Sequence, residues 1–290
     1  MSQYHAYRYV AVLCAALIGV VPAGAAEDEL PVRHIGNFQL WTVIEVVSRS
    51  TTSILIDDTE EKKQFIAQKL PDGVYQAETN CFVLKTGDAY YLFDTGFGLG
   101  NTINAALVKI GIDADRISGI FITHSHRDHI GGLQKDGYTA FPNATLYVSQ
   151  AELVKWGSSP DAQKLFLYKD RIKMFDGAPI DAGGSEIVQG IFAVSAEGHT
   201  VGHTCFLLQS GKQRLLVIGD LVHVQDVQFE MPEISVTYDA DAAQAAAVRR
   251  EILEYAAKRA VPIAGMHLRA PAAGTVKQAK NGFVFTPAKK

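Results

Sequence analysis

Residues 124–129 read His-Ser-His-Arg-Asp-His, which brings four side chains able to bind a metal ion into one short segment. The apolar run 119–123 precedes them directly and has the length of a buried strand. Imidazole nitrogens and carboxylate oxygens are common ligands of Zn²⁺ and similar ions. In an extended segment, the i, i+2 spacing puts His124 and His126 on one side, so Asp128 and His129 can face a second ion. The cluster therefore predicts a metal site where a strand opens into a loop.

Three further apolar runs also end in a residue that can bind a metal ion. They are residues 193–198 before His199, residues 215–219 before Asp220, and residues 261–266 before His267. A single histidine after a strand is more typical of a hydrogen-bonded structural residue. Because strand ends converge when strands share one edge of a sheet, the conjunction with the first cluster predicts one site built from several strand ends.

The composition is that of a globular protein with a buried core. The chain has 290 residues, of which 48% are hydrophobic, so one large domain or two small ones can form. The formal net charge is −4, and basic residues occur in runs no longer than two. We therefore expect neither nucleic acid nor an anionic membrane as a partner.

The first 26 residues have the three parts of a secretory signal peptide. Arg8 comes before an apolar stretch at residues 9–21, and small residues follow. We expect cleavage after Ala25 or Ala26, which makes the mature protein exported, either periplasmic or secreted. A membrane anchor is the alternative, but the stretch is shorter than the about 20 residues of a spanning helix. No membrane association is expected after cleavage.

Three cysteines occur, and Cys14 leaves with the predicted signal peptide. Cys81 and Cys205 lie in apolar, strand-like runs, so two buried free thiols are the first expectation. An oxidising compartment permits a disulfide between them, and the sequence leaves that alternative open.

Strand and helix patterns alternate through residues 27–290 without a linker or an internal repeat, which predicts a single α/β domain. Strands are expected at residues 38–47, 80–85, 89–93, 117–123, 144–148, 187–194, 204–209, 214–218 and 261–266. Helices are expected at residues 59–69 with Thr59 as N-cap, and at 102–110, 151–156, 161–174 and 242–258.

Five segments resemble the five signatures of the metallo-β-lactamase superfamily, in the same order and with similar spacing. They are Phe93-Asp-Thr-Gly96, the run from Thr123 to Leu133, Gly198-His-Thr200, Gly219-Asp220, and His267. The resemblance covers nearly all of the chain after the leader, and it implies an αββα sandwich with a two-ion site in the groove at one sheet edge. Within the superfamily, residues 141–144, 219–223 and 227–229 resemble the branch of methyl-parathion-hydrolase-like enzymes and acyl-homoserine lactonases.

The resemblance also implies roles for individual residues. His124, His126 and His199 would hold one ion, Asp128, His129 and His267 the other, and Asp220 would bridge the two. His203 is the rival ligand to His199, although the superfamily pattern favours the first histidine of that segment. Asp94 would accept a hydrogen bond behind a ligand, or would only close the turn after its strand. The same ligand set binds Zn²⁺, Mn²⁺, Co²⁺ or Fe²⁺, and two Zn²⁺ ions are the first expectation.

A pair of ions predicts hydrolysis of a small-molecule substrate. Two ions roughly 3.5–4 Å apart can share a hydroxide, because coordination lowers the pKa of water from about 15.7 towards ~7. That hydroxide would attack a lactone or ester carbonyl, with organophosphate triesters as a further substrate class. Asp128 can orient the nucleophile. His223 lies three residues beyond Asp220, where related lactonases place a polar side chain, and the resemblance implies that it donates a hydrogen bond to the substrate or leaving group. The alternative for His223 is a purely structural role.

Four other functions remain open at this stage. A β-lactamase usually carries Cys or Ser where Asp220 stands, and an iron redox enzyme carries a carboxylate in place of one imidazole of the first cluster. A glyoxalase-II-like thioester hydrolase and a non-enzymatic exported metal-binding module are the others.

After His267 the branch of methyl-parathion-hydrolase-like enzymes and lactonases often reads Leu-Pro-Phe-Pro-Gly, whereas this chain has Arg269 there. The arginine favours a small or anionic substrate. The oligomeric state is open, a dimer included.

Overall fold

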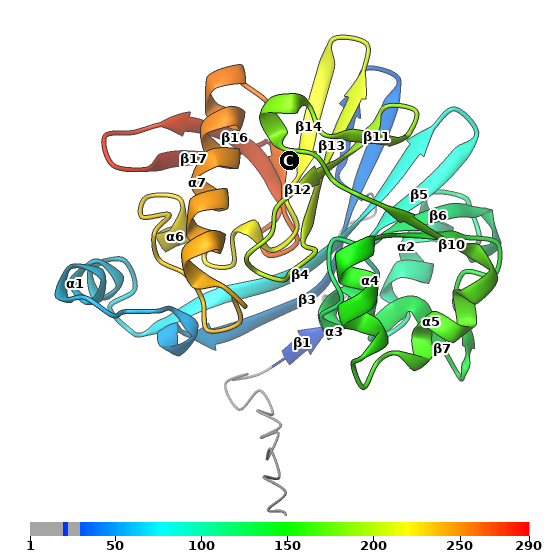
Figure 1. The fold of residues 1–290 in the computed structure, drawn as a ribbon, viewed down its shortest axis with the longest axis horizontal. Helices are drawn as coiled ribbons and strands as arrows, with labels where there is room; N and C mark the ends of the chain where they lie inside the picture. The colour runs from blue at the N-terminus through cyan, green and yellow to red at the C-terminus, as the bar shows by residue number, and fades with distance from the viewer. Residues whose placement is uncertain (1–19, 23–29, 290) are drawn as a thin grey trace, which may run out of the picture.

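The computed structural model describes residues 20–22 and 30–289, and these form two β-sheets packed face to face (Figure 1). The predicted leader, residues 1–26, lies outside the described residues except for 20–22, which pair with the first sheet. Among the described helices, none combines the length and the apolar character needed to cross a bilayer.

The first sheet has eight strands in the order β1-β3-β4-β5-β6-β9-β10, with β2 paired to β3. Strands β5, β6, β9 and β10 pair in parallel, while the earlier strands pair antiparallel. The strands are β1 (Val20–Pro22), β2 (Val32–Ile35), β3 (Phe38–Thr51), β4 (Val74–Thr86), β5 (Ala89–Phe93), β6 (Ile117–Phe121), β9 (Thr145–Ser149) and β10 (Ile172–Phe175).

The second sheet has seven strands in the order β11 to β17, and only β14 and β15 pair in parallel. Its strands are β11 (Ser185–Val188), β12 (Ile191–Ser195), β13 (Thr204–Ser210), β14 (Gln213–Val217), β15 (Ile263–Ala264), β16 (Ala273–Gln278) and β17 (Phe283–Pro287). A small separate hairpin consists of β7 (Gln134–Lys135) and β8 (Tyr138–Thr139).

Helices cover the outer face of each sheet, which gives four layers (Figure 1). Helices α2, α4 and α5 pack on the first sheet and α7 on the second. The helices are α1 (Glu60–Lys69), α2 (Thr102–Lys109), α3 (Arg127–Ile130), α4 (Gln150–Gly157), α5 (Gln163–Tyr168), α6 (Gln225–Gln228) and α7 (Ala242–Arg259). The expected αββα sandwich is thus confirmed.

Alternation along the strands explains why the sheets can be covered on both faces. On β6, Ile120 points to the helices and Phe121 points to the other sheet. On β13, Leu207 faces α7 while Phe206 faces the first sheet. Since successive strand side chains point to opposite faces, uninterrupted apolar strands supply both the central layer and the two outer layers of the core.

Most expected elements are confirmed, including α1 with Thr59 as its N-cap, whose side chain accepts a hydrogen bond from the Lys62 amide. The expected helix at 161–174 is wrong in its second half, because residues 172–175 form β10 and pair with β9. The expected strand at 187–194 is a hairpin that turns at Gly190, whose positive φ of 77° suits glycine. Strands β16 and β17 were not expected. Cys81 and Cys205 are buried free thiols.

Phe121 gives a test of the central layer. Its ring lies 5.2 Å from that of Phe93 and 5.4 Å from that of Phe206, between the sheets. We expect Phe121→Ala to lower the free energy of unfolding by about 3–5 kcal/mol, because it leaves a cavity in a packed core, as measured by urea denaturation. Phe166 is 73% exposed, and Phe166→Ala should stay within about 0.5 kcal/mol of the wild type. Equal losses in both variants would contradict this assignment of the core.

Candidate metal centre

The strand ends named by the sequence meet at one edge of the sandwich. Parallel pairing of β5 with β6 puts Asp94 and the 124–129 segment at the same end of the first sheet. Parallel pairing of β14 with β15 does the same for Asp220 and His267 in the second sheet. Because β13 runs antiparallel to β14, the loop before β13, which carries His199, lies at this end as well. The structure brings all seven candidate ligands together.

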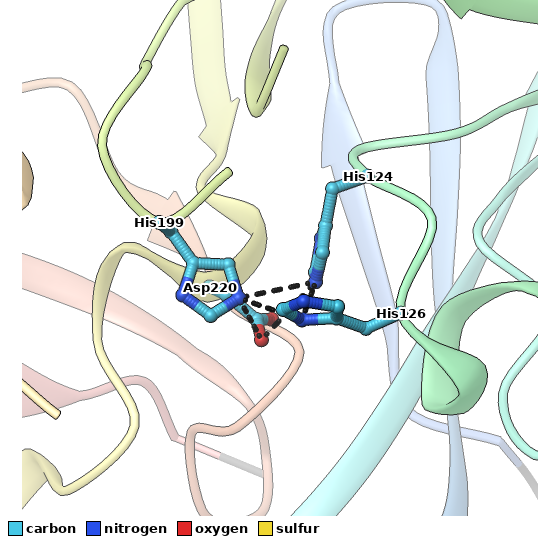
Figure 2. A group of neighbouring side chains, drawn as sticks. All are labelled: His124, His126, His199 and Asp220. Atoms are coloured by element: carbon cyan, nitrogen blue, oxygen red, sulfur yellow. Dashed lines mark hydrogen bonds and ion pairs between the residues drawn. The ribbon is translucent and has the colours of Figure 1, made fainter. Parts of the chain in front are cut away.

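Three imidazoles form the first group, which we call the three-imidazole group: His124, His126 and His199 (Figure 2). The Nε2 atom of His124 lies 2.9 Å from Nδ1 of His126 and 3.2 Å from Nε2 of His199. The remaining pair, His126 Nδ1 and His199 Nε2, is 3.0 Å apart. Three ring nitrogens therefore converge on one point.

Asp128, His129 and His267 form the second group, which we call the mixed group. The Asp128 Oδ2 atom lies 3.5 Å from Nε2 of His129 and 3.4 Å from Nε2 of His267. Partners on the Nδ1 atoms fix the orientation of both rings: His129 Nδ1 contacts Asp94, and His267 Nδ1 donates to the Glu78 carbonyl at 2.8 Å. Both Nε2 atoms are thus left to face the centre.

Asp220 belongs to both groups. Its Oδ1 atom lies 3.1 Å from His129 Nε2 and 3.2 Å from His267 Nε2. Its Oδ2 atom lies 3.3 Å from His199 Nε2 and 3.6 Å from His124 Nε2. One carboxylate therefore stands between the two groups and presents an oxygen to each.

Two buried aspartates hold imidazoles from behind. Asp94 Oδ2 lies 2.7 Å from His129 Nδ1, and the same carboxylate accepts from the Thr123 amide and hydroxyl. Asp239 Oδ1 lies 2.8 Å from His199 Nδ1, and Arg249 stands 3.6 Å from its other oxygen. A partner on one ring nitrogen selects the tautomer that leaves the other nitrogen as a ligand.

The sequence did not single out Asp239 or Glu152. Glu152 is a buried carboxylate that contacts the loops of His126 and His199. The segment Ser149-Gln-Ala-Glu152 has the Ser-x-x-Glu spacing of a capping box, which could have drawn attention to Glu152. Asp239 has no such signal, because it lies in an irregular segment far from His199 in sequence.

His203, the rival ligand, points away from both groups. Its Nδ1 atom donates to the Ala196 carbonyl at 2.9 Å, and its Nε2 atom accepts from the Asp220 amide at 3.0 Å. Burial lowers the pKa of His203 to about 4, which keeps it neutral and able to accept. It positions the Asp220 backbone, and both of its ring nitrogens are engaged.

Burial and mutual contact set the charges of the two groups differently. Burial lowers the pKa of His126 to about 3 and that of His124 well below its ordinary value, so both rings are neutral ligands. In the mixed group, burial opposes ionisation, but neighbouring imidazoles, His129 first, hold the pKa of Asp220 well below its usual range. The Asp220 carboxylate in turn raises the pKa of His267 to about 9 against the effect of burial. The shared carboxylate stays ionised and needs positive charge beside it.

Two observations show that the two ligand groups fit metal ions. Ligands that share one ion at about 2.0–2.1 Å in tetrahedral geometry stand roughly 3.3 Å apart, close to the nitrogen separations in the three-imidazole group. Among the described residues, His129 Nε2 and Asp220 Oδ1 are buried without a hydrogen-bond partner, although they face one another at 3.1 Å. Buried polar atoms without partners are costly, and a cation between them would satisfy both.

His223 and Arg269 lie beside the groups. His223 Nε2 lies 3.1 Å from Asp220 Oδ2, and its ring stacks on His267 with centroids 5.1 Å apart. Its amide donates to Gln228 Oε1, which fixes the backbone. Arg269 forms a two-pronged ion pair with Asp226. The positive charge expected to favour an anionic substrate is therefore offset within the protein.

Comparisons with known proteins agree with this geometry. Residues 75–267 match the family model of the metallo-beta-lactamase superfamily. The chain is similar to the lactamase-like protein nscB of Neosartorya fischeri, with 29% identity over 154 residues that make up 52% of this chain and 40% of that protein. It is also similar to an atrochrysone carboxyl ACP thioesterase of Aspergillus chevalieri, with 25% identity over 52% of this chain and 42% of that protein. The match thus spans about two fifths of these relatives.

Two solved structures are similar over most of the chain. One is the hydrolase AbOPH of the beta lactamase superfamily, with a TM-score of 0.79 and 26% identity, covering 90% of this chain and 98% of that one. The other is AidC, a dizinc quorum-quenching lactonase in complex with a product, with a TM-score of 0.79, 23% identity and the same coverage. The likeness to AidC, at 23% identity, shows only that the two proteins share a fold. With its family signature, its sandwich and its converging ligands, the chain belongs to the metallo-beta-lactamase superfamily.

Proposed function

We propose that this protein hydrolyses lactones or carboxylic esters with two divalent metal ions, Zn²⁺ first among them. The observation that carries the proposal is the Asp220 carboxylate, which presents Oδ1 to the mixed group and Oδ2 to the three-imidazole group. A shared carboxylate suits a pair of ions rather than one, because each oxygen completes a different ligand set.

The seven ligands would divide as the sequence suggests. The three-imidazole group would hold one ion, the mixed group the other, and Asp220 would serve both. Bound there, the ions would lower the pKa of a water molecule towards ~7 and stabilise negative charge on a carbonyl oxygen. All other steps fall to side chains of the chain itself.

Asp128 and His223 are the side chains proposed to act on water and substrate. Asp128 has a side chain that is 22% exposed, against 3% for Asp220, so it is the carboxylate of the site within reach of an incoming water. It can accept a hydrogen bond from that water and orient it towards the carbonyl carbon. His223, whose Nε2 atom lies 3.1 Å from Asp220 Oδ2, can donate to the substrate carbonyl or to the leaving oxygen beside that carboxylate.

A lactone or ester is favoured because the AidC lactonase shares the fold over 90% of this chain. Thioester hydrolysis is the second candidate, favoured by the similarity to the fungal ACP thioesterase. Both reactions begin with attack of water on an acyl carbon, so the site chemistry is the same and only the leaving group differs. Export after removal of residues 1–26 remains part of the proposal, and it would favour substrates outside the cytosol.

Substrate ranking tests the proposed reaction. One preparation with its metal content measured should be assayed against a lactone, an aryl ester, a thioester, an organophosphate triester and a cephalosporin. We expect the highest kcat/KM for the lactone or ester. A thioester ranked first would support the second candidate, and a cephalosporin ranked first would contradict both.

Metal removal gives a second prediction. We expect a chelator to abolish turnover and added Zn²⁺ to restore it, because the ligands alone supply no nucleophile. Free Zn²⁺ at a hundred times its dissociation constant should raise the free energy of unfolding by about 2.7 kcal/mol for each ion bound, since the ions bind only the folded chain. Thermal and urea unfolding with and without Zn²⁺ measure this. Asp220→Ala should lose most of that gain, and full retention would contradict a shared ligand.

His223 gives a third prediction. Replacing it with Ala should lower kcat/KM by about 10²-fold, the effect typical of removing one donor to a developing oxyanion. Metal content, measured by atomic emission, should stay at the wild-type level. His34→Ala is the matched control, because His34 is exposed on β2. A His223→Ala enzyme with full kcat/KM and full metal content would exclude the role.

A further inference from the structure

A buried glutamate lies between the two loops that carry the three-imidazole group. Glu152 is on α4 and is 0% exposed. Its Oε1 atom accepts from the Ser125 amide at 2.9 Å and from the Ser125 hydroxyl at 2.5 Å. Its Oε2 atom accepts from the Thr200 hydroxyl at 2.6 Å and from the Gly202 amide at 3.2 Å. Each carboxylate oxygen therefore holds one loop.

The residues that Glu152 binds are neighbours of the ligands. Ser125 stands between His124 and His126, and Thr200 directly follows His199. The three ring nitrogens are only about 3 Å apart, so a small shift of either loop would separate His199 from the other two. Glu152 thus joins the two loops and sets the distance between them.

The start of α4 anchors this contact to the first sheet. Ser149, the last residue of β9, caps the helix by accepting from the Glu152 amide at 3.2 Å. The same hydroxyl donates to the Gly202 carbonyl at 2.8 Å. Gly202 packs so closely on the helix that a Cβ atom there would collide with the Glu152 amide nitrogen. The His199 loop is therefore seated on a rigid helix end.

The mixed group has a separate support. Asp94 binds the Thr123 amide and hydroxyl and His129 Nδ1, and His267 is held by the Glu78 carbonyl. None of the hydrogen bonds of Glu152 reaches the mixed group. The Thr123 hydroxyl, which donates to Asp94, also lies 3.1 Å from His124 Nδ1, and Asp239 holds His199, so the three-imidazole group has support besides Glu152. The four hydrogen bonds of Glu152 itself stay with the loops of the three-imidazole group.

We propose that Glu152 is a positioning residue for the three-imidazole site, and that its effect is confined to this site, whereas Asp94 chiefly holds the mixed site through His129. The inference rests on the proposed function, because it assumes one ion in each group. Replacing such an outer support typically weakens metal binding 10- to 100-fold. Glu152→Gln keeps the size of the side chain but leaves some of the four donors without an acceptor.

Cobalt titration of the full chain tests the inference, because Co²⁺ absorbs visible light and its spectrum reports the ligands. The two sites are first identified with His126→Ala, which removes a three-imidazole ligand, and His267→Ala, which removes a mixed-group ligand. In Glu152→Gln we expect one of the two sites to bind 10- to 100-fold more weakly, with a remaining spectrum that matches His126→Ala. Asp94→Asn should weaken the other site and leave a spectrum that matches His267→Ala.

Glu186→Gln is the control. Glu186 is also a carboxylate that accepts a backbone amide, that of Gly190 at 2.9 Å, and the β11–β12 hairpin to which both belong carries no candidate ligand. The Glu186→Gln variant should bind two ions with wild-type affinity. Unfolding of the metal-free variants shows whether each still folds. If Glu152→Gln does not fold, Thr200→Val removes only one of the four hydrogen bonds and should weaken the same site several-fold.

The outcomes separate the inference from the proposed function. Wild-type affinity at both sites in Glu152→Gln and in Thr200→Val would overturn the positioning role. Equal weakening of both sites in a folded Glu152→Gln, or loss of the site that His267→Ala loses, would overturn the confinement of the Glu152 effect to the three-imidazole site. A wild-type chain that binds fewer than two Co²⁺ ions would instead overturn the proposed two-ion site, and the inference with it.

Discussion

The structure depends on keeping a dense group of ionisable side chains buried between the edges of two sheets. Buried charges are tolerated only when they are paired and hydrogen-bonded. Asp220 is 3% exposed and His124 and His129 are 0% exposed, so water cannot solvate them. Positive charge must therefore stand in front of the carboxylate, and hydrogen-bond partners must stand behind the imidazoles. Both the ligand sets and their outer partners follow from that requirement.

The outer partners come from different layers of the sandwich. Glu152 belongs to a helix on the outer face of the first sheet, Asp94 ends a strand of that sheet, and Asp239 precedes α7 on the second sheet. The buried Arg249 of α7 donates to the Leu221 carbonyl, beside Asp220, and stands near Asp239. Sites built on packed helices and strands hold ligands more tightly than sites on free loops. The packing of the layers therefore sets the spacing of the ligands.

Local patterns predicted the elements whose stability is local. Thr59 caps its helix as expected. The predicted bounds of the apolar strands β6 and β14, which lead to Thr123 and Gly219, agree with the structure to within two residues. The failures have physical causes. The strand at residues 172–175 has only four residues, and its two middle residues are exposed. Its own sequence therefore favours no strand, and pairing with β9 stabilises it. The strand expected at residues 261–266 comprises only the two residues of β15, and the unexpected strands β16 and β17 pair with β15 and with each other.

The sequence by itself determined which side chains could bind ions, because His and Asp after apolar strands have few other uses at such density. It also determined the fold class, since alternating strands and helices with apolar faces must bury both. Only the tertiary structure decided which residues stand behind the ligands. Glu152, Asp239 and the neutralisation of Arg269 by Asp226 each join segments far apart in the chain or in irregular loops. Such contacts carry no local pattern, because they depend on how the layers pack. The cluster at 124–129 is one half of a site whose other half, and whose supports, folding brings to it.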